Sequence, residues 1–243
     1  MKEMRFLPAA VFLLCLALPG GVRGEEARRV KGLIYSLDGS RLLYRWEMLI
    51  VPPGQTPWQT WYYDPAGRLA ASDRLTWKNG RLVGYDYQRE NIGEEARVWI
   101  QGGKVHYYLR RDGVESRREE EAPLLYAAGA SPIRLIQEHW EELAAGKELL
   151  IRYGVLDLTR SFEFVLARAD RQALDPAGSV TIAMYPSSMF LRFFVDPVYI
   201  CFQEDGSFLS LSGRLLPVDL ADVNIRPTNG RMVLAPGEPG STP

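Results

Sequence analysis

Histidine and cysteine are scarce in this chain of 243 residues, which contains two of each. So few imidazoles and thiols do not make a structural zinc site unless carboxylates complete the shell. Charge of one sign is also lacking, because 29 basic residues stand against 30 acidic ones. The near-neutral balance provides no overall field that would attract nucleic acid or anionic lipid. We therefore predict no metal, no cofactor and no nucleic-acid partner.

Motifs of common catalytic sites are also missing. The sequence contains no Gly-x-Ser-x-Gly, no Gly-x-x-x-x-Gly-Lys, no Gly-x-Gly-x-x-Gly and no His-Glu-x-x-His. This favours a protein that is not an enzyme and has no catalytic residue. Carboxylates among aromatic residues leave a glycoside hydrolase as the enzymatic alternative. The carboxylates in question are Glu47, Asp73, Asp86, Glu94 and Glu95.

The N-terminus has the pattern of a secretory signal peptide. Lys2 and Arg5 precede the apolar run 6–18, the segment 19–21 breaks a helix, and small or short residues precede Glu25. The apolar run is shorter than the roughly 20 residues of a membrane-spanning helix, and no later stretch reaches that length. We therefore predict a signal peptide over 1–24, a periplasmic or secreted protein, and no transmembrane segment in the mature chain.

The first half of the mature chain is predicted to be an antiparallel meander. Turn sequences recur at Asp38-Gly39, at 64–67, at Asn79-Gly80 and at Gly102-Gly103, and they separate short strand candidates. Between the turns, apolar and polar residues alternate, as expected for strands with one buried face. The polar stretch 111–122 is predicted to be an exposed loop or an extension of a strand.

One amphipathic helix interrupts the strands. Ser131 is a suitable N-cap, Pro132 suits the first helical position, and apolar residues recur at helical spacing until Gly146. We therefore predict a helix over 132–145. It is the one main helix expected in the mature chain.

Strand patterns resume after this helix. The predicted strands are 148–153, 161–168, 180–184, 189–195, 198–202 and 207–211, with a turn at Asp196-Pro197 between two strands that are apolar on both faces. Residues 236–243, rich in proline and glycine, are predicted to be a disordered tail. No linker divides the chain, so residues 25–235 are predicted to form a single β-rich domain.

Aromatic residues are concentrated in the predicted meander, and this concentration has two interpretations. Cross-strand aromatic pairs can fill the core of a sheet. Alternatively, the rings can line a concavity that holds an apolar ligand. The candidate ligand contacts are Tyr44, Trp46, Trp77, Tyr85, Trp99, Tyr107, Trp140, Phe190 and Phe194.

The order of elements resembles a known family. A signal peptide, a meander rich in Tyr and Trp, one helix followed by Leu-Ala-Ala-Gly-Lys-Glu at 143–148, and later strands with Glu-Asp-Gly-Ser at 204–207 are similar to DUF3108-type periplasmic proteins. More loosely, the pattern resembles the LolA/LppX-like curved-sheet carriers of lipids and lipoproteins. The resemblance implies a mainly β (α+β) fold, with a strongly curved antiparallel sheet or half-open barrel, one main amphipathic helix and an apolar concavity.

These observations predict an exported, non-enzymatic protein that binds a hydrophobic or lipid-like ligand in the concavity of its curved sheet. The alternative is a structural or interaction protein of the cell envelope with a packed interior, which would bind a protein partner by strand addition at an uncharged edge. An internal cavity would distinguish the two.

Overall fold

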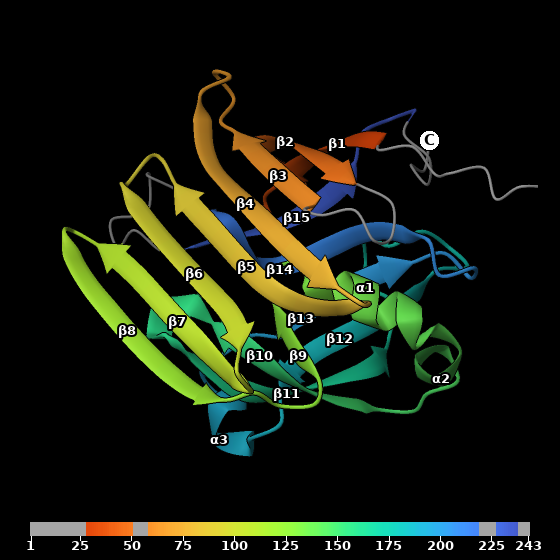
Figure 1. Ribbon diagram of the computed structural model, residues 1–243. Helices are drawn as coiled ribbons and strands as arrows, with labels where there is room; N and C mark the ends of the chain where they lie inside the picture. Colours follow the sequence, from red (N-terminus) through yellow and green to blue (C-terminus); the bar gives the residue numbers. More distant parts are fainter. Residues whose placement is uncertain (1–27, 51–57, 219–226, 238–243) are drawn as a thin grey trace, which may run out of the picture.

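In the computed structural model, residues 28–50, 58–218 and 227–237 are described, and they fold mainly into β-strands (Figure 1). The strands are β1 (Arg28–Tyr35), β2 (Leu42–Ile50), β3 (Trp58–Tyr63), β4 (Leu69–Lys78), β5 (Arg81–Arg89), β6 (Glu94–Gln101), β7 (Lys104–Arg111), β8 (Val114–Glu121), β9 (Tyr126–Ala128), β10 (Leu149–Val155), β11 (Arg160–Ala169), β12 (Val180–Pro186), β13 (Val198–Phe202), β14 (Phe208–Val218) and β15 (Pro227–Leu234). The helices are α1 (Ser131–Glu138), α2 (Trp140–Ala144), the 3₁₀ helix η1 (Leu156–Leu158) and α3 (Met189–Arg192). The predicted signal peptide and residues 238–243 of the predicted tail lie outside the described residues.

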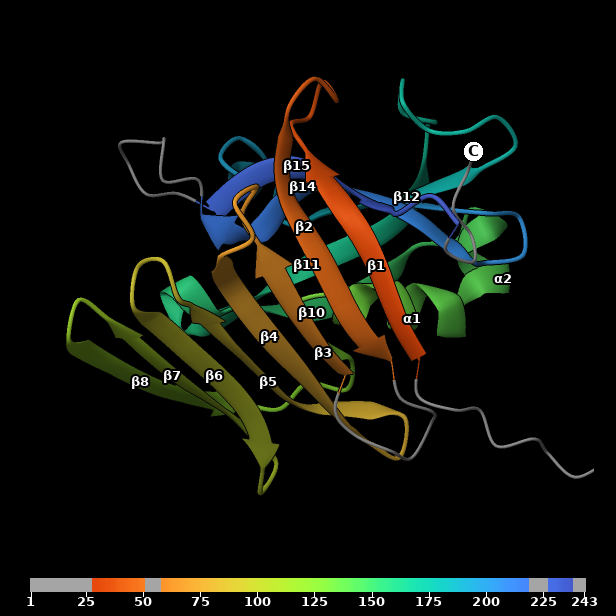
Figure 2. The same ribbon diagram turned by 90° about the horizontal axis from the view of Figure 1, so that it is seen from above.

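The described strands form one sheet in the order β8-β7-β6-β5-β4-β3-β2-β1-β15-β14-β13-β12-β11-β10-β9. Within it, β9 pairs in parallel with β10, and the other described pairs are antiparallel. Strand β15 lies between β1 and β14, so it joins the run β1–β8 to the run β9–β14 (Figure 2). The predicted fold class, a mainly β protein with a curved antiparallel sheet and few helices, is confirmed.

The two ends of the sheet approach each other without pairing. The carboxylate of Glu120 on β8 accepts a hydrogen bond from the backbone N–H of Ser161 on β11 at 3.1 Å. The hydroxyl of Tyr126 on β9 donates to the hydroxyl of Tyr107 on β7 at 3.2 Å. Side chains therefore connect the two runs across the interior, and the sheet stays curved and unclosed.

Local turn chemistry accounts for the meander. Asn79 and Gly80 join β4 to β5 with φ angles of 51° and 75°. Two consecutive positive φ angles are those of a type I′ turn, whose twist matches that of the flanking strands. Asp112 and Gly113 adopt the same conformation, with φ of 52° and 74°. They connect β7 to β8, so the stretch 111–122 forms an edge strand after a hairpin turn.

Aromatic side chains fill much of the interior. Their rings lie in the core together with aliphatic side chains of both runs. The buried aromatic residues of the first run are Tyr44, Trp46, Tyr62, Trp77, Tyr85, Tyr87 and Tyr107. On the second run, α1 and α2 cover one face of the sheet with Ile136 and Leu143. Most of the aromatic concentration is therefore used for packing.

The single helix predicted over 132–145 is wrong in one respect, because it is broken at His139. Helix α1 ends at Glu138, and α2 begins at Trp140. Each piece has a different anchor: Ile136 is buried in the core, whereas the Trp140 indole donates to the Glu204 carbonyl at 3.2 Å. Ser131 is the first residue of α1, and the N-cap is Ala130. The Ser131 hydroxyl instead accepts a hydrogen bond from the backbone N–H of Ala128.

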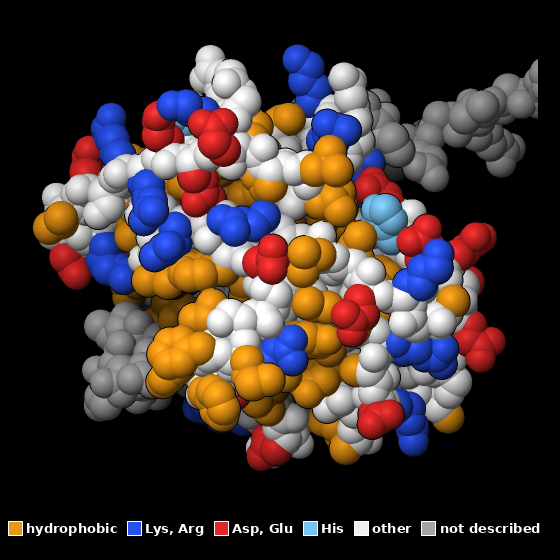
Figure 3. Space-filling model, turned by 90° about the horizontal axis from the view of Figure 1, so that it is seen from below, with side chains coloured by type: hydrophobic (Ala, Val, Ile, Leu, Met, Phe, Trp, Pro, Cys, Tyr) orange, Lys and Arg blue, Asp and Glu red, His pale blue; other side chains and the backbone are white. Residues whose placement is uncertain are grey.

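The strand predicted over 189–195 is also wrong, because the segment forms the short helix α3 and a loop. Arg192 folds the segment back. Its Nε donates to the Pro186 carbonyl at 2.8 Å, and its guanidinium lies 4.4 Å from the centre of the Tyr185 ring. The apolar side chains of the segment are thereby left in solvent, and hydrophobic side chains are visible on the face of the molecule seen from below (Figure 3). The exposed ones are Met189, Phe190, Phe193, Phe194 and Val195.

Candidate functional site

A cavity of about 160 Å³ lies on the concave side of the sheet. One wall comes from β3, β4 and β5, and the other from β10, η1, β14 and β15. The cavity thus lies between residues that are far apart in the sequence. Its apolar lining includes Leu156, Leu211, Leu215, Leu216 and Met232, and its polar lining includes Tyr62, Asp73, Tyr85, Tyr87, Arg89, Tyr153, Asp157 and Arg214.

Asp73 is the polar group of this cavity that is least satisfied. It lies on β4 in the alternating row of inward residues that also contains Ala71 and Leu75, and it is 5% exposed. The hydroxyl of Tyr62 on β3 donates to Oδ2 at 3.2 Å. Oδ1 is buried and has no hydrogen-bond partner in the described part of the chain. A buried acceptor of this kind requires an explanation, such as a ligand.

The environment of Asp73 favours the protonated form of its carboxyl. Burial raises its pKa from 3.8 to about 7, since the charged form is poorly solvated there. The facing hydroxyls of Thr60 and Tyr62 lower the pKa, and the like charge of Asp86 raises it. At neutral pH the site therefore contains a carboxyl group that readily gains or loses a proton.

Tyrosines surround the carboxyl. Burial holds the pKa of Tyr62 and Tyr85 well above the usual value, so their hydroxyls stay neutral and can donate. The Tyr153 hydroxyl donates to the Gly129 carbonyl at 3.1 Å. Gly129 has a φ of 54°, and a Cβ there would lie 2.4 Å from the Tyr85 ring. Glycine at this position therefore lets the ring pack against the loop before α1.

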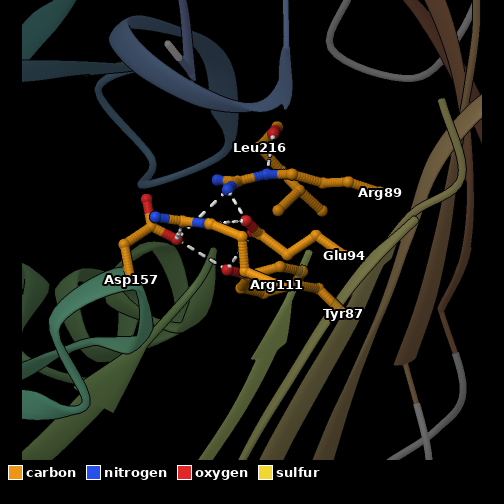
Figure 4. A network of polar contacts seen from close by, with 6 residues as sticks. All are labelled: Tyr87, Arg89, Glu94, Arg111, Asp157 and Leu216. Carbon is orange, nitrogen blue, oxygen red and sulfur yellow. Dashed lines mark hydrogen bonds and ion pairs between the residues drawn. The ribbon is translucent and has the colours of Figure 1, made fainter. Parts of the chain in front are cut away.

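A buried network of charges stands beside the cavity (Figure 4). Arg89 on β5 contacts Glu94 on β6 at 2.5 Å and Asp157 on η1 at 3.1 Å. Arg111 on β7 contacts both of these acids. The Tyr87 hydroxyl donates to Asp157 at 2.6 Å. The network therefore ties three strands of the first run to η1 in the second run.

The network also reaches β14 and keeps Asp157 ionised. The Nε of Arg89 donates to the Leu216 carbonyl at 3.0 Å. Burial acts to raise the pKa of Asp157, but the charges of Arg89 and Arg111 and the hydrogen bond from Tyr87 lower it below the usual value. Because each group has a partner, this part of the wall is rigid, and a ligand need not order it.

The five carboxylates considered for glycoside hydrolysis do not converge. Asp73 lines the cavity, and Glu94 is held by the arginines of the network. The other three belong to ion pairs between side chains that are directed away from the interior by strand alternation. Glu47 pairs with Lys31, Asp86 with Arg74, and Glu95 with Arg110.

Of the nine predicted ligand contacts, Tyr85 lines this cavity. Four others are buried in the packed core, namely Tyr44, Trp46, Trp77 and Tyr107. Three of these four have hydrogen-bonded polar atoms. The Tyr44 hydroxyl donates to the Val218 carbonyl, the Trp46 indole to the Val233 carbonyl, and the Tyr107 hydroxyl to Glu120.

The remaining four predicted contacts lie elsewhere. Trp99 is 39% exposed and stacks on His106. Trp140 packs against Phe202. Phe190 and Phe194 contact each other in the exposed segment that contains α3. The structure therefore does not bring the nine residues together.

Sequence reasoning missed Tyr62, Tyr153 and the apolar residues of β14 and β15 as lining residues. One signal was present for Asp73: it occupies an inward position of a strand whose neighbouring inward positions, Ala71 and Leu75, are apolar. An acid in such a row is unusual, because burying a carboxylate is costly. The opposite wall had no comparable local signal.

No family profile and no curated protein matches the chain. A solved structure described as a beta-barrel-like protein of domain of unknown function DUF1849 from Brucella abortus has 10% sequence identity and a TM-score of 0.41, over 86% of this chain and 96% of that one. The resemblance to DUF3108-type and LolA/LppX-like proteins stays a prediction.

Across residues 28–50, 58–218 and 227–237, no three His, Cys, Asp or Glu side chains are grouped as a metal site would require. The helices in these ranges are also too short or too polar to span a bilayer.

Proposed function

We propose that this protein is an exported, non-enzymatic binding protein that holds a small apolar molecule, or the apolar end of a larger one, in the concavity of its curved sheet. The observation that carries the proposal is the cavity lined by leucines, a methionine and tyrosines, into which the carboxyl of Asp73 is buried with an unpaired oxygen. Export is supported by the signal-peptide pattern at residues 1–24.

The volume of the cavity limits the ligand. Pockets for drug-sized molecules usually measure about 300–1,000 Å³. A cavity of about 150 Å³ holds benzene, and the cavity here has about 160 Å³. A ring-sized group therefore fits, whereas a whole lipid chain does not. A lipid-like ligand would place only one end of its apolar part in the cavity.

The rigid wall supports binding. Arg89 and Asp157 belong to the buried network and also line the cavity, so one wall is held in place before any ligand arrives. Preorganisation of this kind reduces the entropy lost on binding. Beside the cavity, the two halves of the sheet are joined by ion pairs and hydrogen bonds of this network, which hold them in a fixed arrangement.

Strand addition, the alternative function, has less support. The edge strand β8 has the sequence Val-Glu-Ser-Arg-Arg-Glu-Glu-Glu, and most of its side chains are exposed. Charged side chains on an edge oppose pairing with another strand. The other edge strand, β9, has three residues, all of them buried.

Binding of small aromatic probes tests the proposal. Toluene, benzyl alcohol and benzylamine are added to the protein labelled with ¹³C at its methionine methyl groups, and the Met232 signal is identified from the variant Met232→Leu. We expect at least one probe to shift this signal saturably. The variant Leu211→Trp fills the cavity and should abolish the shift, whereas Leu33→Trp, in a different groove, should retain it. The proposal fails if no probe shifts the Met232 signal, or if Leu211→Trp leaves the shifts unchanged in a folded protein.

A further inference from the structure

Buried acidic side chains in the described part of the chain are usually paired with an arginine. Glu94, 2% exposed, is paired with Arg89, and Asp175, 6% exposed, is paired with Arg231 at 3.0 Å. Asp73 is equally buried, but its polar neighbours on β3 are the neutral hydroxyls of Tyr62 and Thr60. Of the buried acids described, Asp73 is therefore the exception, and its missing counter-charge needs a physical explanation.

The arginines that line the cavity do not supply this counter-charge. Arg89 is engaged by Glu94, Asp157 and the Leu216 carbonyl. Arg214 lines the cavity but is exposed to solvent. Neither arginine contributes to the pKa of Asp73, on which the like charge of Asp86 acts instead.

We propose that the cavity binds a small monocationic amine, whose ammonium group donates a hydrogen bond to Oδ1 of Asp73 while its apolar body packs against Leu211, Leu215 and Met232. The inference rests on the proposed function and names the ligand class. An ammonium group has three donors, so it satisfies the unpaired oxygen and compensates the buried charge in one contact. The tyrosine hydroxyls around Asp73 offer further acceptors for the same group.

Protonation of Asp73 should then control binding. The raised pKa of this carboxyl, about 7, predicts that the ionised partner of an amine is present above neutral pH and is lost below it. A bound cation would lower this pKa. The groups that face Asp73 from the surrounding elements are Thr60 and Tyr62 of β3, Tyr85 and Tyr87 of β5 and Tyr153 of β10, with Arg89, Asp157 and Arg214 in the same cavity. The charge of Asp86 acts on Asp73 from the outward face of β5.

Three probes of similar shape test the ligand class, with calorimetry and the Met232 methyl signal as readouts. At about pH 8, benzylamine should bind at least about tenfold more tightly than benzyl alcohol, a difference of about 1.4 kcal/mol. Toluene should bind no more tightly than benzyl alcohol. In Asp73→Asn the benzylamine preference should disappear. Asp86→Asn removes a charge of the same sign from the outward face of β5 and should keep the preference within about twofold.

Each outcome separates this inference from the proposed function. If benzyl alcohol or toluene binds as tightly as benzylamine, the cavity binds ligands but the amine class is wrong. If benzoate, added as a fourth probe, binds more tightly than benzylamine, the carboxyl acts as a neutral donor and the inference is overturned. If none of the probes binds, both proposals fail. Should Asp73→Asn not fold, the wild-type protein still decides the question, because benzylamine affinity must fall between about pH 8 and about pH 5.

Discussion

The carboxylate of Glu120 on the edge strand β8 accepts a hydrogen bond from the backbone N–H of Ser161 on β11 at 3.1 Å. Strand β8 is one edge of the sheet, and β11 lies two strands in from the other edge, β9, so a side chain connects two strands that do not pair. The Tyr107 hydroxyl donates to the same carboxylate at 2.5 Å. The side chain of Glu120 thus connects the two runs of strands.

Removal of the Glu120 carboxylate should destabilise the fold. In Glu120→Ala the N–H of Ser161, a residue that is 4% exposed, loses its acceptor, and an unsatisfied buried group costs about 1–3 kcal/mol. Urea denaturation should show a loss of that size. Glu119→Ala is the matched control, because Glu119 is exposed and pairs with Lys104, so its loss should leave the free energy of unfolding nearly unchanged. Equal effects of the two substitutions would contradict the role of Glu120.

The buried network should be more sensitive still. Arg89→Met leaves Glu94 and Asp157 without the partner they share, and breaking a buried ion pair from one side typically costs about 3–5 kcal/mol. Arg74→Met removes an arginine from the exposed pair with Asp86 and should cost about 0–1 kcal/mol. Both free energies of unfolding are measured in urea near neutral pH. A loss below about 1 kcal/mol for Arg89→Met would show that the network is dispensable.

The hairpins of the first run could be predicted because their signals are local. Asn79 and Gly80 specify a turn whatever the rest of the chain does, since few other residue pairs accept two positive φ angles. Alternation then determines the inward face, which is why Tyr44 and Trp46 are buried as the pattern indicates. Ring size alone does not show whether such a face encloses a ligand or packs on itself.

Other elements depend on distant partners and had weaker signals. Strand β15 was not predicted; it pairs with β1 from the opposite end of the chain. The run at 189–195 is apolar except for Arg192, so periodicity does not separate strand from helix there. The contacts of Arg192 with Pro186 and Tyr185 decide the outcome.

The candidate site likewise combines residues that have a local sequence signal with residues that have none. Tyr85 could be selected from its aromatic row, and Asp73 is one of the carboxylates that suggest a glycoside hydrolase. In the opposite wall, Leu215 and Met232 come from strands more than a hundred residues later in the chain. Whether Oδ1 of Asp73 has a hydrogen-bond partner depends on which groups this wall places beside it, and such long-range contacts cannot be read from a single sequence.

Stability should respond to pH through Asp73. Its pKa is raised from 3.8 to about 7 in the folded protein, so the folded state holds this proton more tightly than the unfolded state. The stabilisation from the proton is therefore full below about pH 3.8, declines as the pH rises, and is gone above about pH 7. At about pH 8, Asp73→Asn should be more stable than the wild type by up to about 4 kcal/mol.

This pH effect is measured as a difference between variants, because other groups also titrate. The free energy of unfolding is determined in urea from about pH 4 to about pH 8 for the wild type, Asp73→Asn and Asp86→Asn. The advantage of Asp73→Asn should shrink toward zero at the acidic end. Asp86→Asn should show no such trend, because Asp86 is half-exposed and lies in a surface pair. A pH-independent difference between the wild type and Asp73→Asn would place the pKa of Asp73 near its ordinary value.

The exposed segment around α3 gives the clearest test of the corrected fold. Phe190 and Phe193 are 70% and 80% exposed, so Phe190→Ser and Phe193→Ser should change the free energy of unfolding by no more than about 0.5 kcal/mol. Phe202, fully buried on β13, is the control, and Phe202→Ala should cost about 3–5 kcal/mol. A strand covered on both faces over 189–195 would give Phe190→Ser a cost similar to that of Phe202→Ala. Urea denaturation of the three variants therefore distinguishes the exposed helix from the buried strand, and a large loss for either serine variant would contradict the exposed position of this segment.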